Sequence, residues 1–389
     1  MIIRIIVQKF ILALRMLMSP DKLFTPIQDV FHRGKGINGD ALIIYRTIPF
    51  LLNPNHPAFV FHQNMIQSRI IAKSLDYFGY RVDVADYTKV DDIPLKSYGI
   101  VISHNSTINA NHPSFKNAVK VYLASGTEHK THNLRQRRRL GEFISRNGQH
   151  DIELIWDNED MHFTENADAI FCFGNEAVAD TWRSRFSCPV FPFQNTALRE
   201  LEYFDNNSRD DSKHFLFLGS RQQLAKGLDL LLEAFYVTPD LHLHVCGHYL
   251  KDSGFCRAYE KILFHTRNIH PHGWVDVTSR SFRKIAKRCT FTISASCAEG
   301  SPGSITNAMK LGMIPILSSE AGIDGGEGVI IMNDLTIEGI KSTIRQCSNK
   351  SPEQVRELSN KAIKRADRDF TETAFEMRWL EMLDNIIKK

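Results

Sequence analysis

The sequence lacks the cysteine and histidine spacings that build disulfide frameworks or metal sites. Its seven cysteines are scattered over 389 residues, are odd in number and are never arranged as C-x-x-C. Most lie in apolar runs that resemble strands, as reduced cytosolic cysteines commonly do. The 16 histidines show no H-E-x-x-H spacing. We therefore predict neither a disulfide framework nor a zinc site.

The chain also lacks a strong net charge. Its formal net charge is only +4, so we predict no nucleic-acid partner. One local exception is the run RQRRR, Arg135 to Arg139. This run is either a solvated helix face or a site that attracts anionic lipid head groups or an acceptor phosphate.

No apolar run approaches the roughly 18 to 20 residues that cross a bilayer, and no small-residue cleavage site marks a secretory signal. The N-terminal segment 1–38 is nevertheless both apolar and basic in residues 2–18. These residues fit a helix that lies in the membrane interface, or equally a helix that packs against the protein's own body. We predict a cytoplasmic protein that, in the first case, is peripheral on the inner face of the cytoplasmic membrane.

From residue 41 onward, apolar strand-like runs alternate with helical patterns, which indicates a parallel α/β sheet. The first half offers strands at 41–47, 81–85, 99–103, 119–124, 169–173 and 189–193. An amphipathic helix at 65–78 is closed by Gly79 as a C-terminal cap. The polar segment 198–214 then breaks the alternation, and we interpret it as an interdomain linker.

After this linker the alternation starts again. We expect strands at 215–219, 241–246, 269–272, 291–295 and 313–317, and helices at 227–235, 253–265 and 278–287. The pattern predicts two doubly wound, Rossmann-like α/β domains, residues 39–197 and 215–368, that face one another across a cleft. Residues 369–389 carry apolar side chains at helical spacing, and we expect this helix to pack back on the N-terminal domain.

The stretch CAEGSPGSITNAMKLGMIPILS, Cys297 to Ser318, carries the first candidate site. A buried strand precedes it, Glu299 follows the end of that strand, and a helix begins near Ser304. Ligands of open parallel sheets bind at the carboxyl ends of the strands, and a helix N-terminus offers N–H groups to an anion. The stretch therefore predicts a substrate that carries a diphosphate.

The stretch FLFLGSRQQLAKGLDLLLEAF supplies a second candidate site. A strand ends at Gly219, and Arg221 and Lys226 flank the following turn. Arginine offers a bidentate fork and lysine a point charge, so both could reach one anion above the strand ends. Alone, the pair could equally be a surface feature of a strand-turn-helix unit.

Together the two stretches resemble the donor site of the retaining GT-B glycosyltransferases of family four, the group 1 glycosyl transferases. The resemblance covers nearly all of 215–318, and across the first half of the chain it is mostly topological. The matching residues are Gly219, Arg221, Lys226, Gly227, Leu231, Glu233, Ala234, Phe235, Glu299, Gly300, Ala308, Gly312, Pro315 and Ile316.

The resemblance implies roles for these residues. Arg221 and Lys226 would neutralise the diphosphate of a nucleotide-sugar as it leaves, and Glu299 would accept hydrogen bonds from sugar hydroxyls. Trp274 falls where the family holds the nucleotide base, although it could equally be a core residue. The implied nucleotide-sugar-binding residues are Gly219, Arg221, Lys226, Gly247, Trp274, Glu299, Gly300, Ser301, Pro302, Gly303, Ser304 and Asn307.

The chain departs from the family at two places. Asn307 stands where the family usually has a second Glu that binds the ribose, a task that an amide can perform without charge. In the first domain, residues 49–62 (PFLLNPNHPAFVFH) replace a glycine-rich loop. These departures leave activity expected but place donor identity and affinity in doubt.

Family members often carry a functional histidine in the loop after the strand at 119–124. His129 is therefore the first candidate for a catalytic histidine, with Glu128 and His132 nearby. His104, after the strand at 99–103, is the alternative. Either ring could orient a sugar hydroxyl or relay a proton from the acceptor.

The resemblance predicts a retaining, metal-independent glycosyltransferase of the hexosyltransferase type, with no cofactor besides its nucleoside-diphosphate sugar donor. The acceptor would be a glycan or a lipid-linked acceptor in surface polysaccharide or glycolipid assembly. Two alternatives stay open. The same fold hosts nucleotide-sugar epimerases and phosphorylases, and Asn307 could mark a catalytically impaired binding or scaffold protein.

Overall fold

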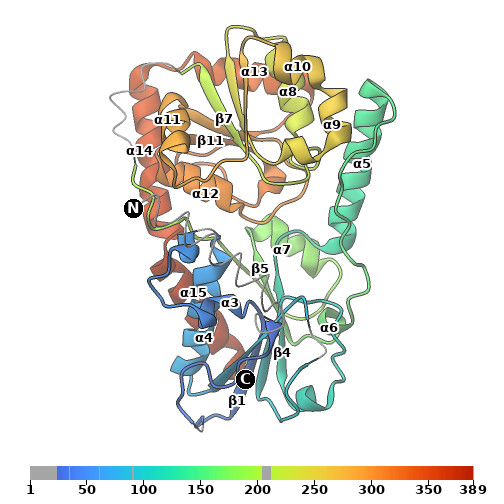
Figure 1. The fold of residues 1–389 in the computed structure, drawn as a ribbon, viewed down its shortest axis with the longest axis vertical. Coiled ribbons are helices and arrows are strands. Elements are labelled where there is room, and N and C mark those ends of the chain that lie inside the picture. The colour runs from blue at the N-terminus through green and yellow to red at the C-terminus, as the bar shows by residue number, and fades with distance from the viewer. Residues whose placement is uncertain (1–23, 35, 61, 90–91, 204–211, 389) are drawn as a thin grey trace.

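The computed structural model describes residues 24–34, 36–60, 62–89, 92–203 and 212–388. The membrane contact expected for residues 2–18 lies outside these ranges. Within them, no helix is both long and apolar enough to cross a membrane. The chain forms two α/β domains stacked along the long axis of the molecule (Figure 1).

The N-terminal domain is built on a parallel sheet. Its strands are β1 (Asp40–Tyr45), β2 (Arg81–Asp86), β3 (Ile100–Ser103), β4 (Val119–Ala124), β5 (Ala169–Phe173) and β6 (Val190–Phe193). They lie in the order β2-β1-β3-β4-β5-β6. Neighbouring strands are nearly all buried on both faces, as in a sheet that helices cover from both sides.

The helices of this domain are α3 (Ile48–Leu51), α4 (Asn64–Tyr77), α5 (His129–Asn147), α6 (His162–Glu165) and α7 (Glu176–Arg183). Helix α4 ends where the sequence predicts. Gly79 has a φ of +78°, and its N–H donates to the Asp76 carbonyl at 2.9 Å. Only a residue without a Cβ adopts this conformation without strain, so the glycine turns the chain directly into β2.

The C-terminal domain repeats the architecture with a second parallel sheet. Its strands are β7 (His214–Leu218), β8 (His242–Cys246), β9 (Ile269–Gly273), β10 (Phe291–Ser294), β11 (Ile314–Ser318) and β12 (Ile330–Met332). Their order is β12-β11-β10-β7-β8-β9, the arrangement of a doubly wound dinucleotide-binding sheet. The expected α/β fold with two doubly wound domains is thus confirmed.

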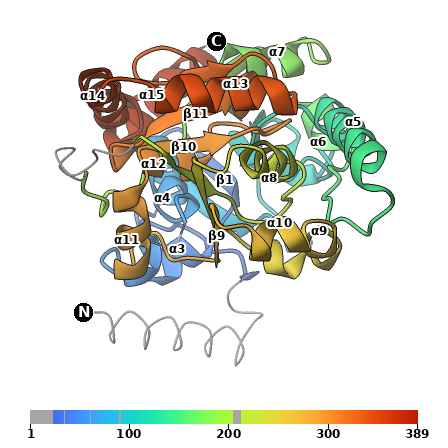
Figure 2. The same ribbon diagram turned by 90° about the horizontal axis from the view of Figure 1, so that it is seen from above.

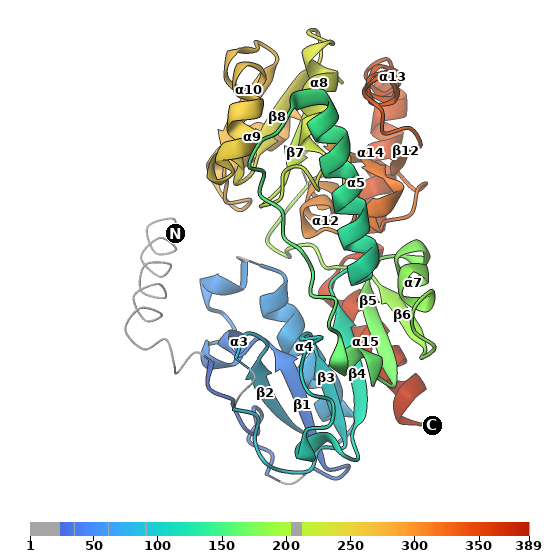
Figure 3. The same ribbon diagram turned by 90° about the vertical axis from the view of Figure 1, so that its right-hand side faces the viewer.

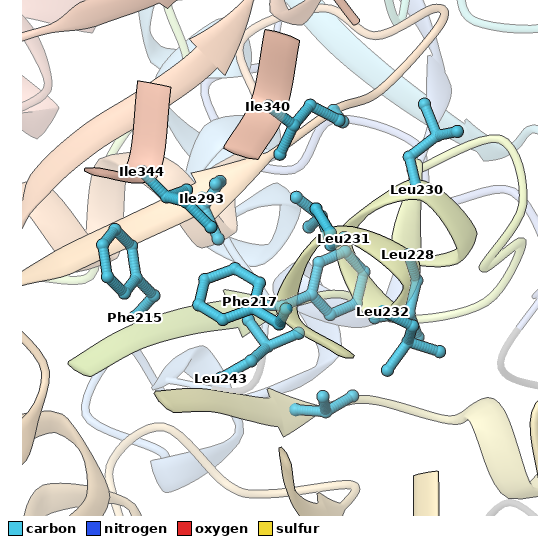
Figure 4. Close-up of a cluster of buried hydrophobic side chains, with 14 of the residues drawn as sticks. Phe215, Phe217, Leu228, Leu230, Leu231, Leu232, Leu243, Ile293, Ile340 and Ile344 are labelled. Carbon is cyan, nitrogen blue, oxygen red and sulfur yellow. The ribbon is translucent and has the colours of Figure 1, made fainter. Parts of the chain in front are cut away.

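Helices cover both faces of the C-terminal sheet. They are α8 (Leu228–Tyr236), α9 (Ser253–Ala258), α10 (Glu260–His265), α11 (Arg280–Arg288), α12 (Gly303–Lys310) and α13 (Ile337–Ser348). Helices α8 and α10 lie on one side of the sheet, and α11 and α12 on the other (Figure 2). Phe215, Phe217 and Ile293 of the sheet pack against Leu231 of α8 and Ile340 of α13 in the main core of this domain (Figure 4).

The chain ends in two long helices, α14 (Pro352–Asp369) and α15 (Glu372–Ile387). Helix α14 starts with a capping box formed by Ser351 and Gln354. Helix α15 returns to the N-terminal domain, where Phe375, Trp379 and Leu383 join the core that includes α4 and β1. The last helix therefore ties the end of the chain to its first domain.

Helix α5 differs from the sequence-based expectation. The segment after β4 was expected to be a loop that holds His129, but His129 is the first residue of a 19-residue helix. Glu128 caps it by accepting a hydrogen bond from the Thr131 N–H at 2.9 Å. The helix leaves the N-terminal domain and runs alongside the C-terminal domain, so one element contacts both (Figure 3).

The helix expected at 253–265 is also different, because it is divided into α9 and α10 at Tyr259. The ring of Tyr259 is 1% exposed, and its hydroxyl accepts a hydrogen bond from Asn147 Nδ2 of α5 at 3.0 Å. Tyr259 thus contacts α5 at the break, and periodicity alone does not reveal such a contact.

Candidate active site

Each sheet has one switch point, where the connections of two neighbouring strands diverge to opposite faces. In the C-terminal sheet it lies between β7 and β10, and in the N-terminal sheet between β1 and β3. Such points leave a crevice at the carboxyl ends of the strands. A cavity of about 820 Å³ is lined by residues that follow all four of these strands. Its size suits a small ligand such as a nucleotide-sugar.

Ten of the twelve predicted nucleotide-sugar-binding residues line this cavity. They are Gly219, Lys226, Gly247, Trp274, Glu299, Gly300, Pro302, Gly303, Ser304 and Asn307. Ser301 and Arg221 do not line it. Sequence reasoning missed the residues that the N-terminal domain adds to the lining, including Arg46, His62 and Gln63.

Lys226 and Glu299 form an ion pair inside the cavity, with Lys226 Nζ bound to Glu299 Oε1. Their side chains are 19% and 21% exposed, so the pair is only partly screened by water. Lys226 comes from the turn after β7 and Glu299 from the turn after β10. The structure thus brings together the two motifs that lie far apart in the sequence.

The N-terminus of α12 opens into the same cavity. Pro302 occupies the cap position, and no side chain caps the helix. The N–H groups of Gly303 and Ser304 belong to the first turn and have no acceptor among the described residues. Two free N–H donors and the positive end of the helix dipole, beside Lys226, form an anion-binding arrangement.

Ser301 has a structural rather than a ligand-facing position. It is fully buried with a φ of +52°, its N–H donates to the Ala321 carbonyl, and its Oγ accepts from the Asn195 N–H. Beside it, a Cβ on Gly300 would lie 2.3 Å from the Cα of Gly126 in the other domain. Glycine is required here because the two domains meet backbone to backbone at the turn that carries Glu299.

Arg221 points away from the cavity. Its Nε donates to Glu153 Oε1 at 2.6 Å, and its side chain is 59% exposed. Glu153 lies in the segment that follows α5. The expectation that Arg221 and Lys226 both reach one anion is therefore not met in this structure, because the arginine has a carboxylate partner from another part of the chain.

Asn307 is 5% exposed and lies on α12. Its Oδ1 accepts a hydrogen bond from the Leu198 N–H at 2.8 Å. Because a backbone N–H can only donate, the amide orientation is fixed, and Nδ2 has no partner among the described residues. Asn307 thus fastens the interdomain segment to α12 and retains one donor for a ligand in the cavity.

Trp274 is a surface residue of the cavity and not part of the core. Its side chain is 57% exposed, and its ring stacks on His248 with centroids 5.8 Å apart and an interplanar angle of 15°. Gly247 precedes that histidine, and a Cβ there would lie 2.9 Å from the Gly219 carbonyl oxygen. The two strand ends therefore pack closely under an exposed aromatic platform.

The N-terminal switch point contributes Arg46 after β1 and His104 after β3. His104 Nδ1 lies 2.8 Å from the Leu123 carbonyl oxygen, so Nδ1 carries the proton. Burial and the nearby Arg46 lower the pKa of His104, which keeps the ring neutral at pH 7. Nε2 has no partner among the described residues and is therefore a hydrogen-bond acceptor at the cavity.

His129 does not line the cavity. Its Nδ1 lies 2.7 Å from the Asn158 carbonyl oxygen, and its Nε2 lies 3.2 Å from the Tyr122 hydroxyl. Both ring nitrogens are therefore occupied inside the N-terminal domain. Glu128 and His132 are likewise engaged, Glu128 with Arg185 and His132 with Asp157. Of the two histidines considered from the sequence, the structure places His104 at the cavity.

Across the described parts of the chain, no group of three or more His, Cys, Asp or Glu side chains is arranged to hold a metal ion. The polar groups that line the cavity include Lys226 and Arg46, the carboxylates of Asp276 and Glu299, five amides, two histidines and the N-terminus of α12. This set is suited to a ligand that has both an anionic part and hydroxyl groups.

Two Rossmann-like domains whose switch points share one cavity define the GT-B fold. The solved structure of sucrose-phosphate synthase from Thermosynechococcus elongatus matches with a TM-score of 0.62 at 13% identity, covering 90% of this chain and 99% of that one. HepE of Anabaena, solved with UDP and glucose, gives 0.57 at 10% identity, covering 90% and 100%. WaaG, a glycosyltransferase of lipopolysaccharide biosynthesis, gives 0.54 at 13%, covering 90% and 100%.

The C-terminal domain also matches a known family in sequence. Residues 212–349 match the family described as Glycosyl transferases group 1. The resemblance to the GT-B glycosyltransferases of family four is thus confirmed, by this match in the C-terminal domain and by the fold of both domains. No protein of curated function matches the chain in sequence.

Proposed function

We propose that the protein transfers a sugar from a nucleoside diphosphate to a hydroxyl group of an acceptor, with retention of configuration at the anomeric carbon. The observation that carries this proposal is the joining of Lys226, Glu299 and the N-terminus of α12 in one cavity. The lysine and the helix suit a diphosphate, and the carboxylate suits sugar hydroxyls.

In the proposed reaction, the bond between the anomeric carbon and the diphosphate oxygen breaks. Negative charge then develops on the diphosphate. Lys226, once it has turned to the bound diphosphate, and the N–H groups of Gly303 and Ser304, which are already in place, would stabilise it. Donor binding would displace Lys226 from Glu299, so the lysine faces the phosphate and the carboxylate accepts hydrogen bonds from the sugar.

The nucleoside would lie toward Trp274, with Asn307 Nδ2 donating to a ribose oxygen. Arg221, which is paired with Glu153, could reach the diphosphate only if that ion pair opened. We therefore assign the main electrostatic role to Lys226 and the helix and not to Arg221.

The acceptor would approach from the N-terminal domain. The neutral ring of His104 presents Nε2 as an acceptor, which could orient a hydroxyl of the sugar or of the acceptor. The acceptor hydroxyl bonds to the anomeric carbon, and its proton passes to the leaving diphosphate. We propose His104, rather than His129, as the histidine of this site.

The acceptor that we propose is a glycan or a lipid-linked glycan in surface polysaccharide or glycolipid assembly. WaaG, one of the similar structures, is named for lipopolysaccharide biosynthesis, and HepE was solved with UDP and glucose. These names support the substrate class. We also propose that the reaction needs no divalent metal, because a lysine and a helix N-terminus take the place that a metal would have at the diphosphate.

A panel of nucleoside-diphosphate sugars tests the proposal, each incubated with and without glycan and lipid-linked acceptors. We expect turnover of one donor only when an acceptor is present, a product with the donor's anomeric configuration by NMR, and no change with EDTA. Conversion of a nucleotide-sugar in the absence of any acceptor would instead identify an epimerase. The absence of both donor binding and turnover would favour a scaffold protein.

A further inference from the structure

A second cavity, of about 610 Å³, lies between α5 and the C-terminal domain. It shares no lining residue with the donor cavity. One wall is the basic face of α5, which carries Arg135, Arg138, Arg139 and Arg146. The opposite wall includes Asn333 and other polar residues at the start of α13. The basic run noted in the sequence thus lines an open groove between α5 and the C-terminal domain.

Arg139 is the most buried of these arginines, with only 4% of the residue exposed. Its Nη2 donates to the Ala295 carbonyl oxygen at 3.2 Å, but Nη1 has no hydrogen-bond partner within the described ranges. The Asp229 carboxylate lies 3.8 Å from Nη1, which is too far for a hydrogen bond. A buried guanidinium nitrogen without an acceptor is costly. Nη1 has almost no accessible surface, so a ligand oxygen could pair with it only after the side chain turned toward the cavity.

The nearby carboxylates are already engaged by other arginines. Arg146 binds Asp229 Oδ2 at 2.5 Å and Glu233 Oε1 at 3.1 Å. Arg138 Nε binds Glu142 at 2.9 Å.

Arg135 is half-buried and makes no hydrogen bond or ion pair with any described residue. This side of the cavity therefore carries one excess positive charge, because its four arginines outnumber the three carboxylates, Asp229, Glu233 and Glu142.

The opposite wall of the cavity is acidic. Glu320 and Asp334 are carboxylates there, and Asn333 adds an exposed amide. Asp334 Oδ1 accepts from the Thr336 N–H at 2.8 Å, which leaves its other oxygen available. Carboxylate and amide groups commonly bind hydroxyl groups, and the two carboxylates repel an anion. An anion must therefore bind at the arginine wall, with any hydroxyl groups on the other side.

From this arrangement we propose that the second cavity is a binding site for a sugar phosphate. The phosphate would bind Arg135 and Arg139 on α5, and the sugar hydroxyls would face Asn333, Asp334 and Glu320. Arginine suits a phosphate because its planar fork donates two parallel hydrogen bonds. The proposal does not rest on the proposed glycosyl transfer, because the two cavities have separate linings.

Calorimetric titration of the full chain with glucose 6-phosphate, inorganic phosphate and glucose tests the site. We expect glucose 6-phosphate to bind with one-to-one stoichiometry, phosphate at least tenfold more weakly, and glucose not measurably. The variant Arg135→Gln should weaken glucose 6-phosphate binding at least tenfold. Asn333→Ala should weaken glucose 6-phosphate binding and leave phosphate binding unchanged.

Two controls locate the binding. Arg137→Gln alters the same basic run, but Arg137 is 63% exposed and does not line the cavity, so binding should be unchanged. Lys226→Ala changes the donor cavity and should also leave glucose 6-phosphate binding unchanged. Binding that survives Arg135→Gln and Asn333→Ala, or that is lost in either control, would overturn the proposal, as would no binding of glucose 6-phosphate. Circular dichroism melting confirms that each variant is folded.

Discussion

The two switch points of the molecule face one cavity but are built in different ways. The C-terminal switch point combines the ion pair of Lys226 and Glu299 with the N-terminus of α12. This helix has eight residues, and its first N–H groups have no acceptor among the described residues. The N-terminal one lacks such a helix, because α3 after β1 has only four residues. It offers side chains instead, a half-buried Arg46 beside Tyr87 and the neutral His104. The C-terminal switch point is thus suited to binding a charged group tightly, and the N-terminal switch point to orienting hydroxyl groups of a ligand.

This difference indicates a division of labour between the domains. In the proposed reaction, the fixed N–H groups and the lysine would bind the diphosphate, which is charged both in the donor and as the leaving group. The neutral imidazole of His104 and the arginine would contact the acceptor. In this account, changes at the C-terminal switch point should abolish donor use, whereas changes at the N-terminal one should mainly slow transfer.

The largest effect is expected for Lys226→Ala. Removing a group that stabilises developing charge typically costs ~10²- to 10³-fold in rate, so we expect kcat/KM to fall by about that factor. The variant Glu299→Gln should reduce turnover with less loss of nucleoside diphosphate binding. Lys284→Ala, an exposed change on α11 of the same domain, serves as the control. Unchanged turnover in both Lys226→Ala and Glu299→Gln would refute the assigned site.

A smaller effect is expected at the other switch point, for His104→Ala. Because general acid-base or orienting groups contribute about 10²-fold or more, we expect kcat to fall by about 10²-fold with little change in donor KM. The matched variant His129→Gln should retain kcat within about threefold, since its ring binds only within its own domain. Equal losses in the two variants would remove the distinction between the histidines.

The C-terminal sheet should also respond to acid. Its strands β7, β8 and β9 carry histidines in hydrogen-bonded pairs, His214 with His244, His242 with His270 and His244 with His272, at 2.9 to 3.1 Å between ring nitrogens. Burial, with further contributions from neighbouring histidines and Arg288, lowers the pKa of His244 to about 2 and that of His270 to about 4.

In the unfolded chain a histidine binds a proton near pH 6.5, whereas these rings stay neutral in the folded state. Stability is therefore complete above pH 6.5 and is lost as the pH falls below it, by about 1.4 kcal/mol per pH unit for each such ring. Hydrogen exchange of β7 to β9 at pH 7 and pH 5 measures this loss. His244→Gln should reduce the slope by one ring's share, and Lys284→Gln should not. An unchanged slope in His244→Gln would contradict the assignment.

The smallest effect is expected at Asn307. In Asn307→Glu the carboxylate can still accept from the Leu198 N–H, but the Nδ2 donor is lost. We expect nucleoside diphosphate binding to weaken about fivefold, which corresponds to the ~1 kcal/mol of one hydrogen bond. Asn307→Ala should in addition lower Tm, because the Leu198 N–H loses its acceptor. Tighter binding in Asn307→Glu would show that the amide is not a donor to the ligand.

The sequence predicts those parts of the molecule whose structure is determined by short, contiguous segments of the chain. Lys226 and Glu299 each stand next to a strand end within a short motif, and parallel strands place both at one edge. The buried strands were likewise visible as apolar runs. His104 and Arg46 come together only through the order of β1 and β3 in the sheet, which periodicity does not specify.

Contacts between distant segments accompany two of the remaining differences. Arg221 is paired with Glu153, and Tyr259, at the break between α9 and α10, is hydrogen-bonded to α5. His129 lies in a helix because Glu128 caps it from the preceding position. Glu153 and α5 lie far from their partners in the sequence, so the sequence alone could not predict these two contacts. Glu128 directly precedes His129, and this cap is a local signal that the sequence contains.

The most direct test of the account is calorimetric titration of the intact protein with UDP, GDP and their parent nucleosides, repeated with Lys226→Ala. The account predicts that one nucleoside diphosphate binds with one-to-one stoichiometry. In Lys226→Ala it should bind at least tenfold more weakly, whereas the weak binding of the parent nucleoside should be unchanged. Equal diphosphate affinity in the wild type and in Lys226→Ala, or no binding of either diphosphate, would contradict it.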